Sequence, residues 1–380
     1  MKVLIIFGTR PEAIKMAPVY HALNDSSSID VITCITAQHR EMLDQVIQIF
    51  DLKIDYDLDL MKKNQSLTSL TASAIVEIER VINHTNPDLV LVHGDTTTSL
   101  AASIVGFYLG KKIGHVEAGL RTYDLQAPFP EEFNRQVTGL ISSIHYAPTE
   151  LSKKNLLQEE KNIDSIHITG NTVIDSLYWV INKLDNDPRL QNTLLNELNT
   201  RLGFDITSSK YILITGHRRE NFGKGFSDIF QAIKKLSIDF PDFKFIYPVH
   251  LNPKVKVPVS EILGDQKNVK LIEPQDYLNF ILLLKNCYVV MTDSGGIQEE
   301  APSLGKPVLV LRETTERPEA VEAGTVKLVG SNKENIVKEL SKLINNKEIY
   351  NKMANSVNPY GDGLASQRIC KHISNLKYEK

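Results

Sequence analysis

Three acidic residues stand at places where carboxyl groups could move protons. Asp95 follows the apolar run 89–93, Glu117 follows the run 112–116, and Glu131 comes just after two prolines. The carboxyl ends of parallel strands meet at one edge of a sheet, so these groups are candidates for general acid–base catalysis. A structural role also fits each residue taken alone: a helix cap for Asp95, a solvated loop carboxylate for Glu117 and a first-turn helix acid for Glu131.

A glycine-rich turn follows the apolar run 288–291. Ser294, Gly295 and Gly296 lead into a segment with helical spacing, which leaves backbone N–H groups open at a helix N-terminus. Such an end binds anions and suits a phosphate. Glu300, about one helical turn further on, could accept hydrogen bonds from ribose hydroxyls. The pattern therefore predicts a nucleotide site, and a tight strand-to-helix turn without a ligand is the alternative.

One histidine has basic neighbours that favour a role at this site. His217 precedes Arg218 and Arg219, which would make a cationic corner suited to a phosphate. The other histidines at predicted strand ends, His39, His93, His115 and His250, individually fit structural roles better.

Predicted strands alternate with amphipathic helices, which is typical of parallel sheets covered by helices. The strands are expected at Lys2–Phe7, Val31–Thr36, Leu89–His93, Lys112–Val116, Ile144–Ala147, Ile166–Thr169, Tyr211–Thr215, Lys244–Tyr247, Val269–Ile272, Tyr288–Met291, Val308–Leu311 and Val326–Val329. We expect an N-terminal domain over residues 1–169 and a nucleotide-binding domain over 170–361. The last helix, within 362–380, is expected to pack on the first domain.

Composition narrows the function classes. The chain has 380 residues, 42% of them hydrophobic, and its formal charge of -3 gives no electrostatic case for nucleic acid or an anionic membrane. No apolar run reaches the roughly 20 residues that span a bilayer. Three scattered cysteines indicate reduced thiols and a cytoplasmic protein. We find no dinucleotide or Walker motif and no metal-ligand spacing, and we expect no cofactor and no metal.

Motifs along the chain carry a resemblance to a known family. They are Phe7–Lys15, His93–Thr97, His115–Arg121, Pro130–Arg135, Thr169–Asp175, Gly216–Glu220, Asp293–Glu300 and Thr315–Glu319. In these motifs the chain resembles the UDP-N-acetylglucosamine 2-epimerases, particularly the bacterial non-hydrolysing enzymes, over nearly its whole length. The resemblance implies an α/β protein of the GT-B fold, with two Rossmann-like doubly wound parallel-sheet domains, a central cleft and usually a homodimer.

The resemblance also implies a role for each candidate residue. The diphosphate would be held by Ser294, Gly295 and Gly296 with Arg10 and His217 nearby, the ribose by Glu300, and uracil by Gln275 and Phe280, while Arg317 and Arg135 would make further substrate contacts. Catalysis would fall to Asp95, Glu117 and Glu131, with Lys15 beside them and His217 as a further catalytic residue.

The implied reaction is reversible C2 epimerisation of UDP-GlcNAc to UDP-ManNAc, which supplies ManNAc for cell-surface polysaccharide. UDP leaves C1, a carboxylate takes the C2 proton, and 2-acetamidoglucal forms before UDP adds back. A proton must return to the opposite face, so at least two acid–base groups are expected. At least one carboxyl group should have a raised pKa and could serve as the proton donor.

A second UDP-GlcNAc is a possible activator. Gln38, His39 and Gln45 resemble the segment that binds it in bacterial non-hydrolysing members. This chain has Ser73 where several relatives have an arginine, so the strength of activation is not predicted.

Three alternative functions keep the same nucleotide site. A hydrolysing epimerase would release free ManNAc, and a GT-B glycosyltransferase would need an acceptor. A non-catalytic UDP-sugar-binding protein would not need the carboxylates.

Overall fold

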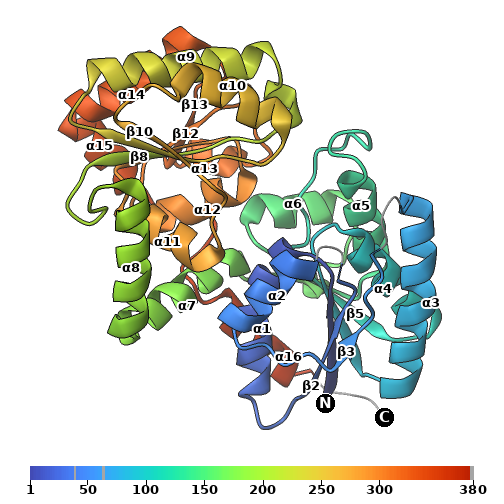
Figure 1. Ribbon diagram of the computed structural model, residues 1–380. Helices are drawn as coiled ribbons and strands as arrows, with labels where there is room; N and C mark the ends of the chain where they lie inside the picture. Colours follow the sequence, from blue (N-terminus) through green and yellow to red (C-terminus); the bar gives the residue numbers. More distant parts are fainter. Residues whose placement is uncertain (38–39, 62–64, 377–380) are drawn as a thin grey trace. The chain divides into compact units, whose positions relative to one another are not determined.

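The computed structural model describes residues 1–37, 40–61 and 65–376, and the chain forms two compact units (Figure 1). Unit 1 contains residues 1–179 and the chain from Tyr360 onward, and unit 2 contains residues 180–359. The chain passes from unit 1 to unit 2 within helix α7 (Thr172–Asn186).

Unit 1 is built on a seven-stranded parallel sheet with the order β3-β2-β1-β4-β5-β6-β7. Its strands are β1 (Lys2–Phe7), β2 (Asp30–Ile35), β3 (Tyr56–Asp57), β4 (Leu89–His93), β5 (Lys112–Val116), β6 (Ile144–Ala147) and β7 (Ile166–Ile168). Strand β3 was not predicted, because its two residues pair only with Cys34 and Ile35 and leave no periodic pattern.

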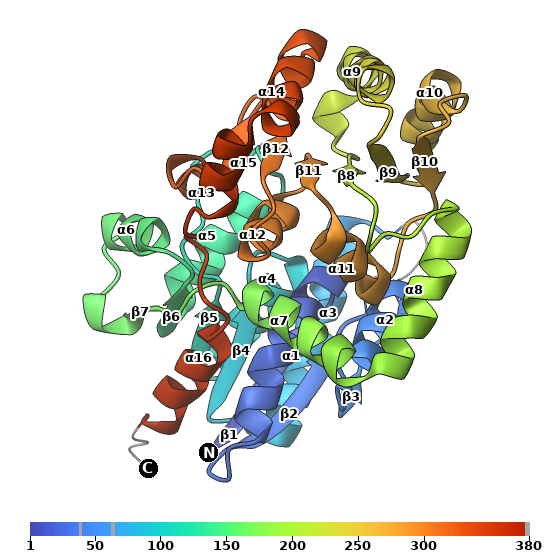
Figure 2. The ribbon, with the colours of Figure 1, turned by 90° about the vertical axis from the view of Figure 1, so that its left-hand side faces the viewer.

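Helices cover both faces of this sheet. They are α1 (Arg10–Asn24), α2 (Arg40–Ile49), α3 (Leu67–Thr85), α4 (Thr97–Tyr108), α5 (Glu131–Ile141), α6 (Glu150–Gln158), α7 and α16 (Ala365–Ser374), with a 3₁₀ turn at Ile163–Ser165. Residues of α3 and α4 pack against alternate strand residues such as Leu4 and Val90. Helix α16 lies against α1, where the Cys370 thiol donates to the Ala22 carbonyl (Figure 2).

Unit 2 repeats this plan with a six-stranded parallel sheet, ordered β10-β9-β8-β11-β12-β13. Its strands are β8 (Tyr211–Thr215), β9 (Lys244–Pro248), β10 (Val269–Ile272), β11 (Val289–Thr292), β12 (Val308–Val310) and β13 (Val326–Leu328). Its helices are α8 (Pro188–Leu202), α9 (Lys224–Asp239), α10 (Pro253–Leu263), α11 (Tyr277–Asn286), α12 (Gly295–Ser303), α13 (Pro318–Glu322), α14 (Lys333–Asn345) and α15 (Lys347–Ala354), with a 3₁₀ turn at Arg219–Asn221. Helices α9, α10 and α14 pack on one face, and α11 and α12 lie on the other (Figure 1).

Both sheets have a topological switch point, where the strand order reverses. It lies between β1 and β4 in unit 1 and between β8 and β11 in unit 2. Loops that leave the carboxyl ends of these strands diverge to opposite faces, which opens a crevice where ligands of doubly wound sheets bind. The predicted pair of doubly wound parallel sheets is therefore confirmed, and each sheet has a defined place for a site.

Among the described residues, we find no helix long and apolar enough to cross a membrane.

The loop after β5 depends on a glycine that no other residue can replace without movement. Gly119 has a φ of +94°, and a Cβ atom there would lie 2.3 Å from the Ser152 carbonyl oxygen of α6. Gly110 offers a matched comparison, because its φ is +65° and a Cβ there would meet no heavy atom within 4 Å.

We expect Gly119→Ala to lower the free energy of unfolding by on the order of 3 kcal/mol, through backbone strain together with the clash. Gly110→Ala introduces the backbone strain without a clash, so it should lower the free energy of unfolding by about 1–2 kcal/mol. Urea unfolding of both variants measures the difference. Equal losses would show that the contact with α6 does not constrain the loop.

Candidate functional site

A buried carboxylate bridges the switch point of unit 1. Glu12, on α1, is 2% exposed. Its Oε2 accepts hydrogen bonds from the backbone N–H groups of Gly8 at 3.0 Å and Thr9 at 2.8 Å, and its Oε1 accepts one from the Thr96 hydroxyl at 2.7 Å. Burial raises the pKa of Glu12, against the opposing effect of these hydrogen bonds. The loop after β1 is thus fixed to the loop after β4.

Glu117 lies at the end of β5 and receives two hydrogen bonds on one oxygen. Its Oε2 accepts from the Lys15 ammonium group and from Asn171 Nδ2 at 2.9 Å, and its side chain is 8% exposed. The backbone of Glu117 has a φ of +62°, which a non-glycine residue adopts only when its surroundings hold it there. Two converging donors favour the ionised carboxylate.

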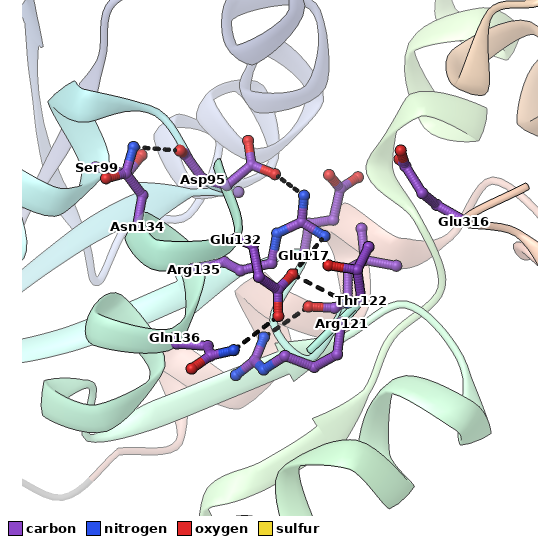
Figure 3. Close-up of polar contacts among 12 residues, drawn as sticks. Asp95, Ser99, Glu117, Arg121, Thr122, Glu132, Asn134, Arg135, Gln136 and Glu316 are labelled. Atoms are coloured by element: carbon purple, nitrogen blue, oxygen red, sulfur yellow. Dashed lines mark hydrogen bonds and ion pairs between the residues drawn. The ribbon is translucent and has the colours of Figure 1, made fainter. Parts of the chain in front are cut away.

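Asp95 lies in the same region, with a different environment. Its Oδ2 is 2.7 Å from Arg135 Nη2, and Asn134 Nδ2 donates to its backbone carbonyl at 2.8 Å (Figure 3). The Asp95 side chain is 27% exposed. Burial raises the pKa of Asp95, Arg135 opposes this, and the charges of Glu117 and Glu131 add to the rise. Asp95 is therefore easier to protonate than an ordinary aspartate.

Two adjacent glutamates at the start of α5 have different surroundings. Glu132 is fully buried and accepts hydrogen bonds from the backbone N–H groups of Thr122 and Tyr123, both at 3.0 Å, and from Gln136 Nε2 (Figure 3). Burial acts against ionisation, but these bonds lower the pKa of Glu132 overall. Glu131 Oε2, in contrast, is buried and has no hydrogen-bond partner among the described residues.

Two buried histidines near these carboxylates are neutral at pH 7. Burial lowers the pKa of His93 to about 4, and its Nε2 lies 3.8 Å from Glu117 Oε2 without a hydrogen-bond partner among the described residues. Burial also lowers the pKa of His115 to about 3, and its Nε2 lies 2.7 Å from the Gly94 carbonyl oxygen. His115 thus fixes the glycine before Asp95.

A second buried carboxylate bridges the switch point of unit 2. Asp293, after β11, is fully buried. Its Oδ2 accepts hydrogen bonds from the backbone N–H groups of His217 at 2.9 Å and Arg218 at 2.8 Å, after β8, and from Asn221 Nδ2 at 3.3 Å. The His217 side chain remains 46% exposed, and its ring stacks on His250 with centroids 5.6 Å apart. Burial lowers the pKa of His217, although Asp293 opposes the shift.

The glycine-rich turn forms the N-terminus of α12, as the sequence predicted. Ser294 is the residue before the helix, and its side chain makes no capping hydrogen bond. A Cβ at Gly295 would lie 2.7 Å from Arg317 Cζ, so only glycine allows this guanidinium to sit over the turn. Arg317 Nε donates to Glu299 Oε1 at 2.7 Å, and Nη1 lies 3.2 Å from Glu316. At Gly296 the space is open, because a Cβ there would meet no heavy atom within 4 Å.

The remaining candidates of unit 2 gather around α11 and α12. Glu300 is 6% exposed, and its Oε1 accepts from the Tyr277 hydroxyl at 2.7 Å. Gln275, just before α11, accepts from Arg201 Nη1 at 3.1 Å, and Phe280 lies partly buried on α11.

The predicted activator segment is only partly described. Gln38 and His39 lie outside the described residues, whereas Gln45 is exposed on α2. Ser73, on α3, lines a pocket of about 470 Å³ together with Leu60 and Val76.

The structure brings most candidates into two groups. In unit 1, Lys15 contacts Glu117, Arg135 contacts Asp95, and the three carboxyl groups are close enough for their charges to interact at Asp95. In unit 2, Arg317 contacts the turn that Ser294 begins. Arg10 is the first residue of α1, and its side chain is half-buried.

Three residues with central contacts have no individual role in the sequence analysis: Glu12, Asn171 and Asp293. Each lies in one of the motifs that carry the family resemblance. Glu12 is the last residue of a Thr9-x-x-Glu12 capping box, which is a local signal for a helix start, but its contact with Thr96 and the contacts of Asn171 and Asp293 with Glu117 and His217 join segments distant in sequence. Among the described residues, no group of three or more His, Cys, Asp or Glu side chains could hold a metal ion.

Comparison with known proteins gives consistent matches over nearly the whole chain. The family described as UDP-N-acetylglucosamine 2-epimerase matches residues 21–374. A UDP-N-acetylglucosamine 2-epimerase of Yersinia pestis is 53% identical over 375 residues, which cover 99% of each chain. One of Escherichia coli K12 is 52% identical with the same coverage.

Solved structures agree with the sequence comparisons. The crystal structure of UDP-GlcNAc 2-epimerase from Neisseria meningitidis bound to UDP-GlcNAc superposes with a TM-score of 0.91 at 53% identity, covering 98% of this chain and 99% of that one. An S. aureus MnaA–UDP structure gives a TM-score of 0.87 at 45% identity, covering 98% of this chain and 95% of that one. The expected GT-B-like fold is therefore confirmed.

Replacing Asp293 tests whether this carboxylate holds the loop after β8. Asp293→Ala would leave the backbone N–H groups of His217 and Arg218 without their acceptor. We expect the free energy of unfolding of unit 2 to fall by on the order of 3 kcal/mol. Urea unfolding measures this loss. Asp242→Ala, at an exposed position before β9, is the control and should change stability by less than about 0.5 kcal/mol. Equal midpoints for both variants would contradict the anchoring role.

Proposed function

This chain belongs to the UDP-N-acetylglucosamine 2-epimerase family, and from that premise we propose that it interconverts UDP-GlcNAc and UDP-ManNAc without net hydrolysis. The observation that carries the proposal is the group of three interacting carboxyl groups, Asp95, Glu117 and Glu131, in unit 1. A protein that only binds a nucleotide sugar has no use for them, whereas a reaction that moves a proton at carbon does.

The proposed reaction begins with an elimination. The bond between C1 and the diphosphate oxygen breaks, its electron pair leaves with UDP, and a base removes the proton from C2. The C2–H electron pair becomes the C1=C2 double bond of 2-acetamidoglucal. In the return step, a proton adds to the opposite face of C2 and a UDP oxygen bonds to C1. Atoms and charge balance without an oxidant or reductant.

The environments of the carboxyl groups support a division of roles. Glu117 accepts hydrogen bonds from Lys15 and Asn171, which suits a base that must be ionised before the reaction. Asp95 has a raised pKa, which suits a group that carries a proton. Glu131 keeps one buried oxygen without a partner among the described residues, and this oxygen could accept from a hydroxyl or amide of the sugar.

Unit 2 supplies groups for the leaving UDP. The turn Ser294–Gly295–Gly296 at the start of α12, with the Arg317 guanidinium beside it, could take up the diphosphate charge as it develops, chiefly through the backbone N–H groups of Gly295 and Gly296, since the Ser294 N–H donates to the Thr292 hydroxyl at 2.9 Å. His217 could donate to a phosphate oxygen. Glu300 could bind the ribose, with Gln275 and Phe280 at the uracil. Arg10 and Arg135 would place positive charge next to the bound substrate.

Three finer points belong to the same proposal. A second UDP-GlcNAc would act as activator through the segment that includes Gln45, and the product would supply ManNAc for cell-surface polysaccharide. A homodimer would cover apolar side chains on α4 and α5, where Tyr108 is 77% exposed and Leu140 is 69% exposed.

Proton NMR of UDP-GlcNAc with the protein in D₂O tests the function. We expect deuterium at C2 of the sugar and new signals of UDP-ManNAc, because the proton removed from C2 exchanges with solvent before one is returned. Free ManNAc without UDP-ManNAc would identify a hydrolysing epimerase instead. Transfer of the sugar to an acceptor without C2 exchange would identify a glycosyltransferase, and an unchanged spectrum would leave only binding.

Glu117→Gln and Asp95→Asn test the acid–base roles. We expect each variant to lower turnover on the order of a hundredfold or more, the scale for the loss of a general acid or base, while UDP affinity changes less than about threefold. Turnover comes from the NMR assay and affinity from calorimetry. Glu150→Gln, an exposed change in the first turn of α6, should leave both unchanged. Turnover close to wild type would remove the substituted residue from the mechanism.

A further inference from the structure

We propose that Asn171 is a positioning residue for the reaction, which holds the Glu117 carboxylate in the orientation that catalysis requires. The inference rests on the proposed function, because it assigns Asn171 a role through Glu117. Asn171 lies just before α7 and is 3% exposed, so its polar groups must be satisfied within the protein.

The side-chain amide and the backbone N–H of Asn171 each have a defined partner. Its Nδ2 donates to Glu117 Oε2 at 2.9 Å, and its Oδ1 accepts from the backbone N–H of Val173 at 3.0 Å. Its own backbone N–H donates to the Tyr360 carbonyl oxygen at 2.7 Å. The side chain therefore connects Glu117 to the start of α7, and the backbone of the same residue connects to the point where the chain re-enters unit 1.

These contacts fix which way the amide faces. A carboxamide could rotate by 180° and exchange its oxygen and nitrogen. Here the rotated form would set Nδ2 against the Val173 N–H and Oδ1 against the Glu117 carboxylate, so two donors and two acceptors would face each other. Only the observed orientation satisfies both neighbours, and it presents an N–H donor to Glu117 at all times.

The backbone around Asn171 is held as firmly as its side chain. Gly170 has a φ of +90°, and a Cβ there would lie 3.4 Å from the Tyr360 carbonyl oxygen. Gly361 has a φ of +126°, and a Cβ there would lie 3.3 Å from Gly170 Cα. The two backbone segments thus touch through glycines, which leaves Asn171 little freedom to move.

The other charged and titratable groups around Glu117 do not replace this donor. Lys15, itself buried, reaches the same oxygen from α1 with an ammonium group whose three N–H donors rotate, so it supplies charge rather than a fixed donor direction. His93, on β4, is 3.8 Å away and neutral at pH 7. Asp95, after β4, carries a like charge when ionised. Asn171 is the short, fixed donor, and it sets the direction of the carboxylate.

Asn171→Ser separates the two roles of the side chain. A serine hydroxyl can still accept from the Val173 N–H, as Ser commonly does at helix starts, but it is too short to reach Glu117. We expect kcat to fall roughly tenfold or more through misplacement of the base, while KM and UDP affinity stay within about threefold. The acidic limb of the pH–kcat profile should move to higher pH by about one unit, because the carboxylate has lost a donor that favours its ionised form.

Asn171→Asp sharpens the test. One carboxylate oxygen can keep the contact with Val173, and the other would face Glu117 with a like charge, so the acidic limb should move further in the same direction. Asn155→Ser is the matched control. Asn155 Nδ2 donates to the Gly119 carbonyl at 2.9 Å in the same loop as Glu117, without contacting Glu117 itself, and its loss should not shift the pH profile.

The outcomes separate the inference from the proposed function. Absence of C2 exchange in the wild-type protein would overturn the function, whatever Asn171 does. Exchange in the wild type, with kcat and pH profile unchanged in folded Asn171→Ser, would overturn the inference alone. Thermal unfolding checks folding, and if the serine variant does not fold, an unshifted profile in Asn171→Asp overturns the inference.

Discussion

A buried carboxylate at each topological switch point holds the rest of the site in place. Glu12 in unit 1 and Asp293 in unit 2 each accept hydrogen bonds from two successive backbone N–H groups, from residues 8–9 and 217–218. Those N–H groups belong to loops that leave the sheet, and in these buried or partly buried positions the carboxylate is their protein partner. A carboxylate can accept several such bonds at once, whereas no apolar side chain can. The loops with the candidate residues are therefore rigid where they leave the strands.

The carboxylate that fixes the loops comes from a different strand's loop in each unit. Glu12 follows its own loop by one helical turn and extends to the Thr96 hydroxyl after the neighbouring strand. Asp293 follows β11 and accepts from the loop that comes after β8. In both cases the first strand of the sheet and the strand across the switch point are joined at their carboxyl ends. This is the place where doubly wound sheets bind ligands.

Neighbouring carboxyl groups in unit 1 have different hydrogen-bond donors and charges around them, and Asp95 and Glu132 have pKa shifts in opposite directions. Glu132 has three donors and a lowered pKa, which makes it an anchor for the loop around Thr122. Asp95, beside other carboxyl groups, has a raised pKa. Glu117 receives its donors on one oxygen. Carboxyl groups with separated environments can take different parts in one reaction, which is the physical basis of the roles proposed for them.

The sequence by itself determined the elements and the chemistry of their ends. Few folds are compatible with apolar runs of strand length that alternate with amphipathic helices. The strands of both sheets other than β3, the loops at their ends and the N-terminus of α12 could therefore be predicted within a residue or two. Only the tertiary structure decided which polar groups meet. Glu131 and Glu132 are adjacent on one helix and point about 100° apart. No local pattern indicates which of the two carboxylates accepts hydrogen bonds from the protein. The contacts of Asp293 with His217 and of Asn171 with Glu117 join residues far apart in the chain. Periodicity is a local property, whereas a hydrogen bond between distant segments exists only after the sheet has brought their strand ends together.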